Sequence, residues 1–228
     1  MEDPETVAAI LVEPIGHTGG IIDPPSEYLP ILREVCDRHN VLLIFDEIIT
    51  GIGRTGEMFA AQTFGVTPDV LCLGKGLSGG YAPLSVMMCR RSIADVFWGA
   101  IEENPGFVEG YIFAGTLVSY PASRACLRGV LEQGLCENCR AQGERLRAGL
   151  EKLGEKTGLI TDIRGKGLFL GIELGRPGIG IEIGRRALEN GLLCRFDPNW
   201  IAFGPPLNIT SQQIDEILAK LDASMYSD

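Results

Sequence analysis

The sequence has 228 residues, of which 45% are apolar and 22% charged, a composition typical of a globular protein with one or two domains. Its formal net charge of −10 argues against nucleic acid as the main partner, because phosphate binding needs a basic surface. No apolar run is long enough to cross a membrane, and acidic residues stand where a signal peptide would be basic, so we expect a cytoplasmic protein without a membrane partner.

The first apolar segment, residues 6–12, predicts a buried strand that ends at Glu13. Glu13 is either a carboxylate at the rim of a sheet or a ligand for a polar substrate group. His17 follows in a glycine-rich loop, and we expect it to be solvated and to have no role. A helical pattern after residue 26 and a second apolar strand at residues 41–45 complete a strand–helix–strand unit, which predicts a parallel sheet.

Three residues at the end of that second strand have alternating directions. Asp46 and Ile48 share one face of the extended segment, and Glu47 points to the other. A carboxylate that leaves an apolar strand needs a positive partner. An aromatic cation with its ring on Ile48 and its ring nitrogen at Asp46 would satisfy both residues. The alternative is that Asp46 only caps the following loop.

A glycine-rich run, GIGRTG at residues 51–56, matches the GxGxxG pattern of dinucleotide-binding turns. In a dinucleotide fold the first glycine follows the strand directly, whereas here residues 46–50 intervene, and only a short helical patch comes after the run. The pattern is therefore a weak indication of such a site.

Lys75 stands directly after a third apolar strand, residues 70–73, and between Gly74 and Gly76. Open sheets of parallel strands bind ligands at the carboxyl ends of those strands. A lysine held in a confined apolar site can lose its proton and act as a nucleophile. Lys75 is therefore either a Schiff-base lysine or a charged residue of an exposed loop.

Thr116 follows a glycine and precedes a long helical pattern, so it can present its hydroxyl group to a phosphate.

The organisation of the sequence changes after residue 130. The helical pattern of residues 121–157 is broken near Gly134, and short strands and two further helices follow it. We expect one domain over residues 1–130 and a small α+β domain over residues 131–228. Cys136 and Cys139 have no second cysteine pair or nearby histidine, so we expect no metal site.

Taken together, six motifs resemble the class III aminotransferases, pyridoxal 5'-phosphate enzymes of fold type I. They are EPI-x-x-x-GG from Glu13, FDE-x-x-x-GxGRTG from Phe45, GKGLSGG around Lys75, Gly-Thr at Thr116, IRG-x-GL-x-x-GIEL, and PPLNIT near the end. The resemblance covers the whole chain. It implies an α/β fold, in which part of a large domain with a mostly parallel sheet and helices on both faces is followed by the small α+β domain.

The resemblance also implies roles for single residues. Lys75 would form the Schiff base with pyridoxal 5'-phosphate and move the substrate proton. Asp46 would keep the pyridine nitrogen protonated, so that the ring acts as an electron sink. Ile48 would pack on the ring, and Thr116 would reach the cofactor phosphate of a neighbouring subunit. A homodimer with shared active sites follows from that last role.

The substrate expectation rests on the segment GLLCRFDPNWIAFGPPL, which resembles the amine or β-alanine:pyruvate branch of the family. In that branch an arginine at the position of Arg195 binds the keto-acid carboxylate and withdraws for an amine. Glu13 falls where some members keep a glutamate near the substrate. Ile49 and Ala202 replace a glutamine and an arginine of the ornithine branch. The expected partners are an amine or ω-amino acid donor and a keto acid acceptor such as pyruvate.

The front of the sequence departs from the family. Members carry a long N-terminal portion before the EPI motif, which includes the phosphate cradle and an aromatic residue that stacks on the cofactor. We therefore expect either part of a longer product or an incomplete, inactive aminotransferase fragment. A more distant alternative is a dinucleotide-dependent oxidoreductase that uses residues 51–56.

Overall fold

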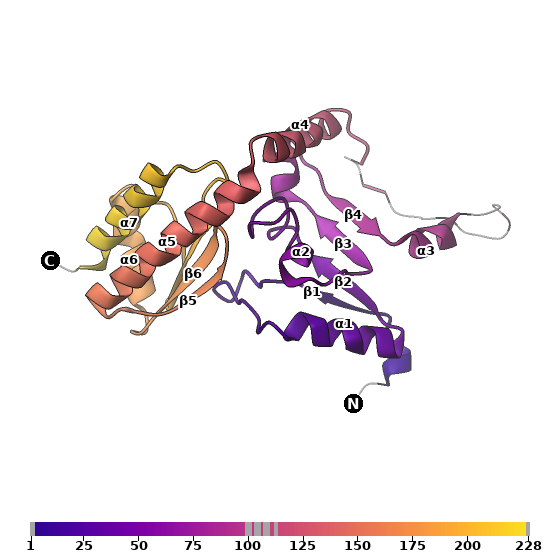
Figure 1. Cartoon of the computed structure of the whole chain (residues 1–228), viewed down its shortest axis with the longest axis horizontal. Coiled ribbons are helices and arrows are strands. Elements are labelled where there is room, and N and C mark those ends of the chain that lie inside the picture. Colours follow the sequence, from indigo (N-terminus) through magenta and orange to yellow (C-terminus); the bar gives the residue numbers. More distant parts are fainter. Residues whose placement is uncertain (1–2, 99–101, 103–105, 107–109, 112–113, 227–228) are drawn as a thin grey trace.

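The computed structural model describes residues 3–98, 102, 106, 110–111 and 114–226, and Figure 1 shows their arrangement. The described residues form two four-stranded sheets, with strand orders β1-β2-β3-β4 and β5-β6-β8-β7. Among the described residues no helix is both long and apolar enough to span a membrane.

The first sheet contains the predicted parallel unit. Strands β1 (Ala9–Val12), β2 (Leu42–Asp46) and β3 (Val70–Leu73) run parallel, and β4 (Val86–Cys89) is antiparallel to β3. Helix α1 (Tyr28–His39) connects β1 to β2 and lies along one side of the sheet (Figure 1). Leu29 and Cys36 of this helix pack with Leu43 and Phe45 of β2, all of them buried. This core confirms the strand–helix–strand interpretation.

Some predicted strand ends are wrong because other groups satisfy the backbone there. Residues 4–6 form the 3₁₀ turn η1 (Pro4–Thr6), so the first strand starts later than predicted. The fourth strand, β4, begins only at Val86, since the Ser78 hydroxyl donates to the Ala82 carbonyl at 2.5 Å and the Ser119 hydroxyl donates to the Pro83 carbonyl at 2.8 Å. Short helices complete this half of the chain: α2 (Ala60–Phe64), η2 (Lys75–Ser78), α3 (Arg91–Ala94) and η3 (Asp95–Phe97).

The predicted break near Gly134 is confirmed. Helix α4 (Ser119–Glu132) ends there, and α5 (Leu135–Thr157) begins after Gly134, whose φ is 62°. Glycine adopts this left-handed conformation without a steric penalty. The two helices lead from the first sheet to the second in Figure 1.

The second sheet is antiparallel and covered by helices. Its elements are β5 (Ile160–Lys166), β6 (Phe169–Leu174), α6 (Ile179–Glu189), β7 (Arg195–Phe196), β8 (Trp200–Phe203) and α7 (Ser211–Met225). Leu150 of α5, Ile172 of β6, Ile183 of α6 and Ile214 of α7 share one buried core. This core is separate from the core around β2, although buried Ile15 and Ile21 of the first half pack with Phe169 and Trp200 of this sheet. The boundary at residue 130, in the last turn of α4, stays a prediction.

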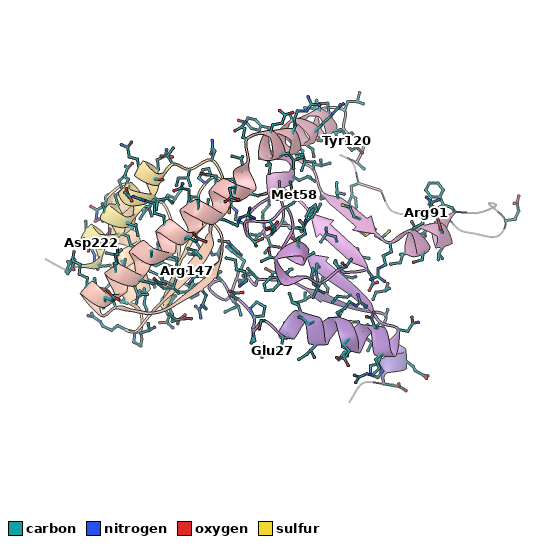
Figure 2. All side chains as sticks on the ribbon, in the orientation of Figure 1. Glu27, Met58, Arg91, Tyr120, Arg147 and Asp222 are labelled. Carbon is teal, nitrogen blue, oxygen red and sulfur yellow. The ribbon has the colours of Figure 1, made fainter. Side chains whose placement is uncertain are left out.

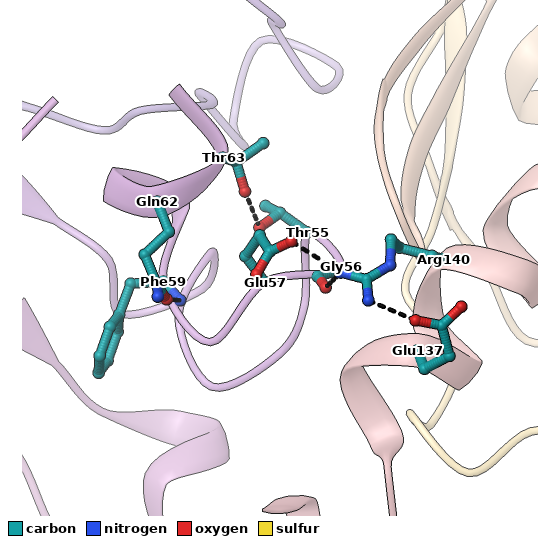
Figure 3. A network of polar contacts seen from close by, with 8 residues as sticks. All are labelled: Thr55, Gly56, Glu57, Phe59, Gln62, Thr63, Glu137 and Arg140. Atoms are coloured by element: carbon teal, nitrogen blue, oxygen red, sulfur yellow. Dashed lines mark hydrogen bonds and ion pairs between the residues drawn. The ribbon is translucent and has the colours of Figure 1, made fainter. Parts of the chain in front are cut away.

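The GIGRTG run forms one of the contacts between the two halves. Gly53 and Gly56 have φ values of 89° and 96°, and between them Arg54 donates to the carbonyls of Leu168 at 3.3 Å and Pro205 at 2.5 Å. Figure 3 shows the neighbouring Gly56 and Glu57 bonded to Arg140 of α5, at 2.6 Å and 2.7 Å. The glycines of this run therefore serve a turn that docks on the second half of the chain.

Candidate active site

Four residues predicted from the sequence line one cavity of 210 Å³: Glu13, Asp46, Ile48 and Lys75. The parallel strands explain why they meet. Glu13 follows β1, Asp46 ends β2, and Lys75 begins η2 just after β3. Because parallel strands end at the same edge of a sheet, the three strand ends deliver their side chains to one place.

Asp46 makes a local bond and has no ion pair with another described residue. Its Oδ1 accepts a hydrogen bond from the Ile48 N–H at 3.0 Å, which is the loop-capping bond considered above. Among the described residues no cation lies within ion-pair distance of this half-buried carboxylate. Asp46 therefore caps its loop and also faces a cavity that a cationic group can enter.

Glu47 points away from the cavity, as the strand alternation predicts. It is buried and accepts hydrogen bonds from the Ala60 N–H at 2.6 Å, the Ala61 N–H at 2.8 Å and the Thr50 hydroxyl at 3.3 Å. Burial raises the pKa of its carboxyl group, against the effect of these bonds. Glu47 thus stabilises the start of α2. Of these two neighbouring carboxylates, Asp46 is the one whose side chain can take part in catalysis.

Lys75 occupies a strained part of the backbone. Its φ is 42°, in the left-handed region that few residues other than glycine adopt. Such strain is concentrated at functional sites. The expectation of a confined lysine is not met by the described residues, because the Lys75 side chain is exposed. The chain contributes one wall of the site and leaves the other side of the lysine open.

The remaining predicted residues lie elsewhere. Thr116 is outside this cavity, in the turn before α4, where its carbonyl accepts a bond from the Ser119 N–H at 3.1 Å. Arg195 lines a second, larger cavity of 1020 Å³, together with Phe169 of β6. Burial raises the pKa of the neighbouring Cys194 thiol to about 11.

His17 belongs to both cavities, and sequence reasoning missed it. Its loop brings it to the wall of the Lys75 cavity and to the wall of the Arg195 cavity. Burial lowers the pKa of its imidazole, the charges of Arg195 and Lys75 lower it further, and Glu13 opposes them. A single histidine in a polar loop gives no sequence signal for this position, since it depends on how the two halves of the chain meet.

A comparison with protein families shows to which family the chain belongs. The family model described as "Aminotransferase class-III" matches residues 1–225. The chain belongs to the class III aminotransferases.

Related aminotransferases agree with this assignment. The chain is 38% identical to a putrescine aminotransferase of Pectobacterium atrosepticum, over 94% of the chain and 46% of that protein. It is 39% identical to ornithine aminotransferase 2 of Staphylococcus aureus, over 95% of the chain and 52% of that protein. The chain thus spans about half the length of these aminotransferases.

A solved structure extends the likeness to the fold. An amine transaminase from an uncultivated Pseudomonas species, in its pyridoxal-phosphate-bound form, matches with a TM-score of 0.89 and 37% identity. The match covers 97% of this chain and 52% of that one. The α/β fold expected of a fold type I aminotransferase is therefore confirmed for the part of the family that this chain represents.

Proposed function

We propose that this chain carries the lysine-bearing part of a pyridoxal-phosphate-dependent aminotransferase, which transfers an amino group from an amine or ω-amino acid to a keto acid such as pyruvate. The observation that carries the proposal is the meeting of Lys75, Asp46 and Ile48 at one cavity in a class III aminotransferase. A cytoplasmic location stays a prediction from the sequence.

The residues of the cavity fit the cofactor. Asp46 offers a carboxylate without an ion pair among the described residues, and a protonated pyridine nitrogen would supply its missing cation. Ile48 offers an apolar side chain beside that carboxylate, where the flat ring would lie. Lys75 offers the amine that would hold the cofactor covalently. When bound, pyridoxal phosphate supplies an electron sink that stabilises negative charge on the substrate carbon.

The protein groups have separate tasks in this reaction. The Lys75 Nζ would accept the proton from the substrate carbon that bears the amino group, which requires its neutral form. Asp46 would keep the ring nitrogen protonated through its negative charge. Arg195 would bind the carboxylate of the keto acid, and Glu13 would contact the polar end of the substrate at the rim of the first cavity.

The dimer and the phosphate contact are also proposals. Thr116 lies outside the Lys75 cavity, which agrees with a role toward the cofactor of a second subunit. A homodimer with shared sites would place the threonine of one protomer near the lysine of its partner. The open side of Lys75 is where such a partner, or the portion of the family beyond this chain's length, would complete the site.

Two alternative functions belong to other classes of protein. An inactive fragment would keep the fold without turnover, because the chain spans about half of its relatives. A dinucleotide enzyme would use residues 51–56, but Arg54 in that run is bonded to the second half of the chain at Leu168 and Pro205. That docking role favours the aminotransferase.

A visible absorption spectrum tests the proposal. Pyridoxal phosphate added to the chain should produce the absorption band of a lysine adduct, and Lys75→Ala should abolish it. Lys166→Ala is a matched control, because Lys166 lies in β5 and pairs with Asp23 at 3.3 Å. A band that survives Lys75→Ala would contradict the site. A band without amino transfer from any donor would favour the inactive fragment.

A further inference from the structure

His17 stands where the Lys75 cavity and the Arg195 cavity meet the same loop. Lys75 lines one of these cavities and Arg195 the other, and His17 lines both. A molecule that uses both the lysine and the arginine would have this imidazole within its surroundings. No motif of the family resemblance assigns His17 a task.

The position of His17 is fixed by its loop. Its ring stacks on Phe169, with ring centroids 5.9 Å apart and planes 8° from parallel. Its backbone N–H donates to Glu13 Oε2 at 3.0 Å. The loop is closed by Gly16 and Ile22, whose backbones exchange hydrogen bonds of 3.0 Å and 2.7 Å. The imidazole is therefore held in place, as a binding group must be.

Trp200 connects this loop to Arg195. The backbone of Gly20 lies so close to the buried indole that a Cβ added there would be 2.7 Å from Trp200 Cγ. The guanidinium carbon of Arg195 lies over the same indole, 5.8 Å from its centroid. A cation over an aromatic face is favourable. The Trp200 side chain of β8 thus contacts both the loop that carries His17 and the Arg195 side chain of β7, and it fixes their relative positions.

The charges around His17 favour an anion. Lys220, in the Arg195 cavity, is paired with Glu216 at 2.8 Å, whereas Arg195 has no ion pair among the described residues. Cys194, with its pKa near 11, stays a neutral thiol at neutral pH. Arg195 from β7 and Lys75 from η2 act on His17 as cations, and Glu13 after β1 opposes them. Asp46 also lines the Lys75 cavity, so it is the side of His17 toward Arg195 that offers an anion a cation unpaired among the described residues.

We propose that His17 and Arg195 together bind the carboxylate of an α-keto acid, with the imidazole N–H of His17 as the second donor. The proposal rests on the proposed function and names the substrate class of its acceptor site. The carboxylate would lie between Arg195 and His17, and the adjacent carbonyl would point to Lys75. The geometry suits a substrate with its carboxylate beside the reacting carbon, because His17 already lines the lysine cavity.

Nuclear magnetic resonance of the imidazole C–H protons tests this role in the full chain. The sequence has 2 histidines, and the second, His39, lies at the exposed end of α1 and serves as an internal reference. Pyruvate should shift the His17 signals and raise the His17 pKa, because an anion stabilises the imidazolium. Acetone, which has the same carbonyl group without the carboxylate, should shift neither histidine.

Two variants separate binding from structure. His17→Phe keeps an aromatic ring for the stack on Phe169 and removes the donor, so pyruvate should bind about tenfold more weakly, since hydrogen bonds to charged groups contribute roughly 1.5 kcal/mol or more. His17→Gln restores an N–H donor and should recover part of the affinity. Arg195→Ala should weaken pyruvate binding at least as much.

Titration calorimetry measures the affinity for pyruvate. The absence of pyruvate binding to the wild-type chain, or unchanged affinity in His17→Phe, would overturn the proposal. An unmoved magnetic resonance signal of His17 at saturating pyruvate would overturn it as well. Failure of the proposed function is visible separately. If the Lys75 adduct band is missing but pyruvate still shifts the His17 signals, the aminotransferase proposal is contradicted and the carboxylate site is supported.

Discussion

Asp69 joins strand β2 to helix α1 and to the segment that follows β4. Its Oδ2 accepts bonds from the Leu43 N–H at 2.7 Å and from Arg33 at 2.8 Å, and its Oδ1 pairs with Arg90 at 3.0 Å. The carboxylate is only 6% exposed. Burial raises its pKa, but the bonds from Leu43 and Arg33 and the charges of Arg33 and Arg90 outweigh burial and hold the pKa below its ordinary value.

Asp69→Asn should therefore lower the free energy of unfolding by roughly 2–3 kcal/mol at pH 7, because two arginines lose their buried partner. The folded pKa is below the unfolded one, so the stabilisation is present above about pH 4 and is lost as the pH falls through the folded pKa. Urea unfolding of both proteins from pH 7 to pH 3 should show the difference shrink in that acid window.

The control for this experiment is Asp95→Asn. Asp95 pairs with Arg91 at 2.9 Å on an exposed surface, where ion pairs contribute at most about 1 kcal/mol. Its replacement should change stability little at any pH. An Asp69→Asn variant as stable as this control, or a difference that does not depend on pH, would contradict the assigned role.

At the scale of elements, two helical glycines offer a matched comparison. Gly143 of α5 lies against the β5–β6 turn, and a Cβ added there would be 2.2 Å from the Gly167 carbonyl oxygen. Gly129 of α4 has only the flexible Gln133 side chain near it, at 3.7 Å. The same substitution should therefore act in opposite directions at the two positions.

Gly143→Ala should destabilise the chain by about 2 kcal/mol or more, because backbone atoms must shift. Gly129→Ala should stabilise it by roughly 0.5–1 kcal/mol, the ordinary gain of alanine in a helix. Thermal unfolding measures both changes. A stabilised Gly143→Ala variant would show that the close contact of α5 with the turn is absent in solution.

Most elements could be predicted from the sequence because their signals are local. Strand β3 has the predicted bounds, and the Thr–x–x–Gln sequence at Thr210 and Gln213 caps α7 with bonds of 3.0 Å and 3.3 Å. The apolar run at residues 192–196 contributes only Arg195–Phe196 to a strand, since only those residues pair with β8. Pairing partners lie elsewhere in the chain, and no local pattern reveals them.

At the scale of the whole molecule, some residues of the candidate site could be predicted from the sequence and others could not. Asp46 and Lys75 could be placed together from the sequence, because parallel strands end at one edge. The position of His17 could not, since it depends on Phe169 and Trp200 of the second sheet. The sequence also left open whether Lys75 lies in a confined site or in an exposed loop, because a sequence motif does not tell which walls of a site the chain itself supplies.

The contact between the two halves leads to the last prediction. Arg54 donates to Leu168 and Pro205, and the Cys139 thiol donates to the Arg54 carbonyl at 3.2 Å. These bonds join a turn of the first half to the second half; Figure 2 shows the side chains of both halves on the ribbon. The buried contacts of Ile15 and Ile21 with Phe169 and Trp200 also join the halves, so the Arg54 bonds add to a coupling that makes the two halves unfold together.

Arg54→Met keeps much of the side-chain volume and leaves both carbonyls without their donor, so the coupling of the two halves should weaken. Thermal unfolding followed by calorimetry should change from one transition to two, or to one clearly broadened transition. Arg145→Met is the control, because the Arg145–Asp215 pair at 2.7 Å joins α5 and α7 within the second half and is exposed. If Arg54→Met unfolds in one sharp transition, like that control, the cores are coupled by other contacts and Arg54 does not link them.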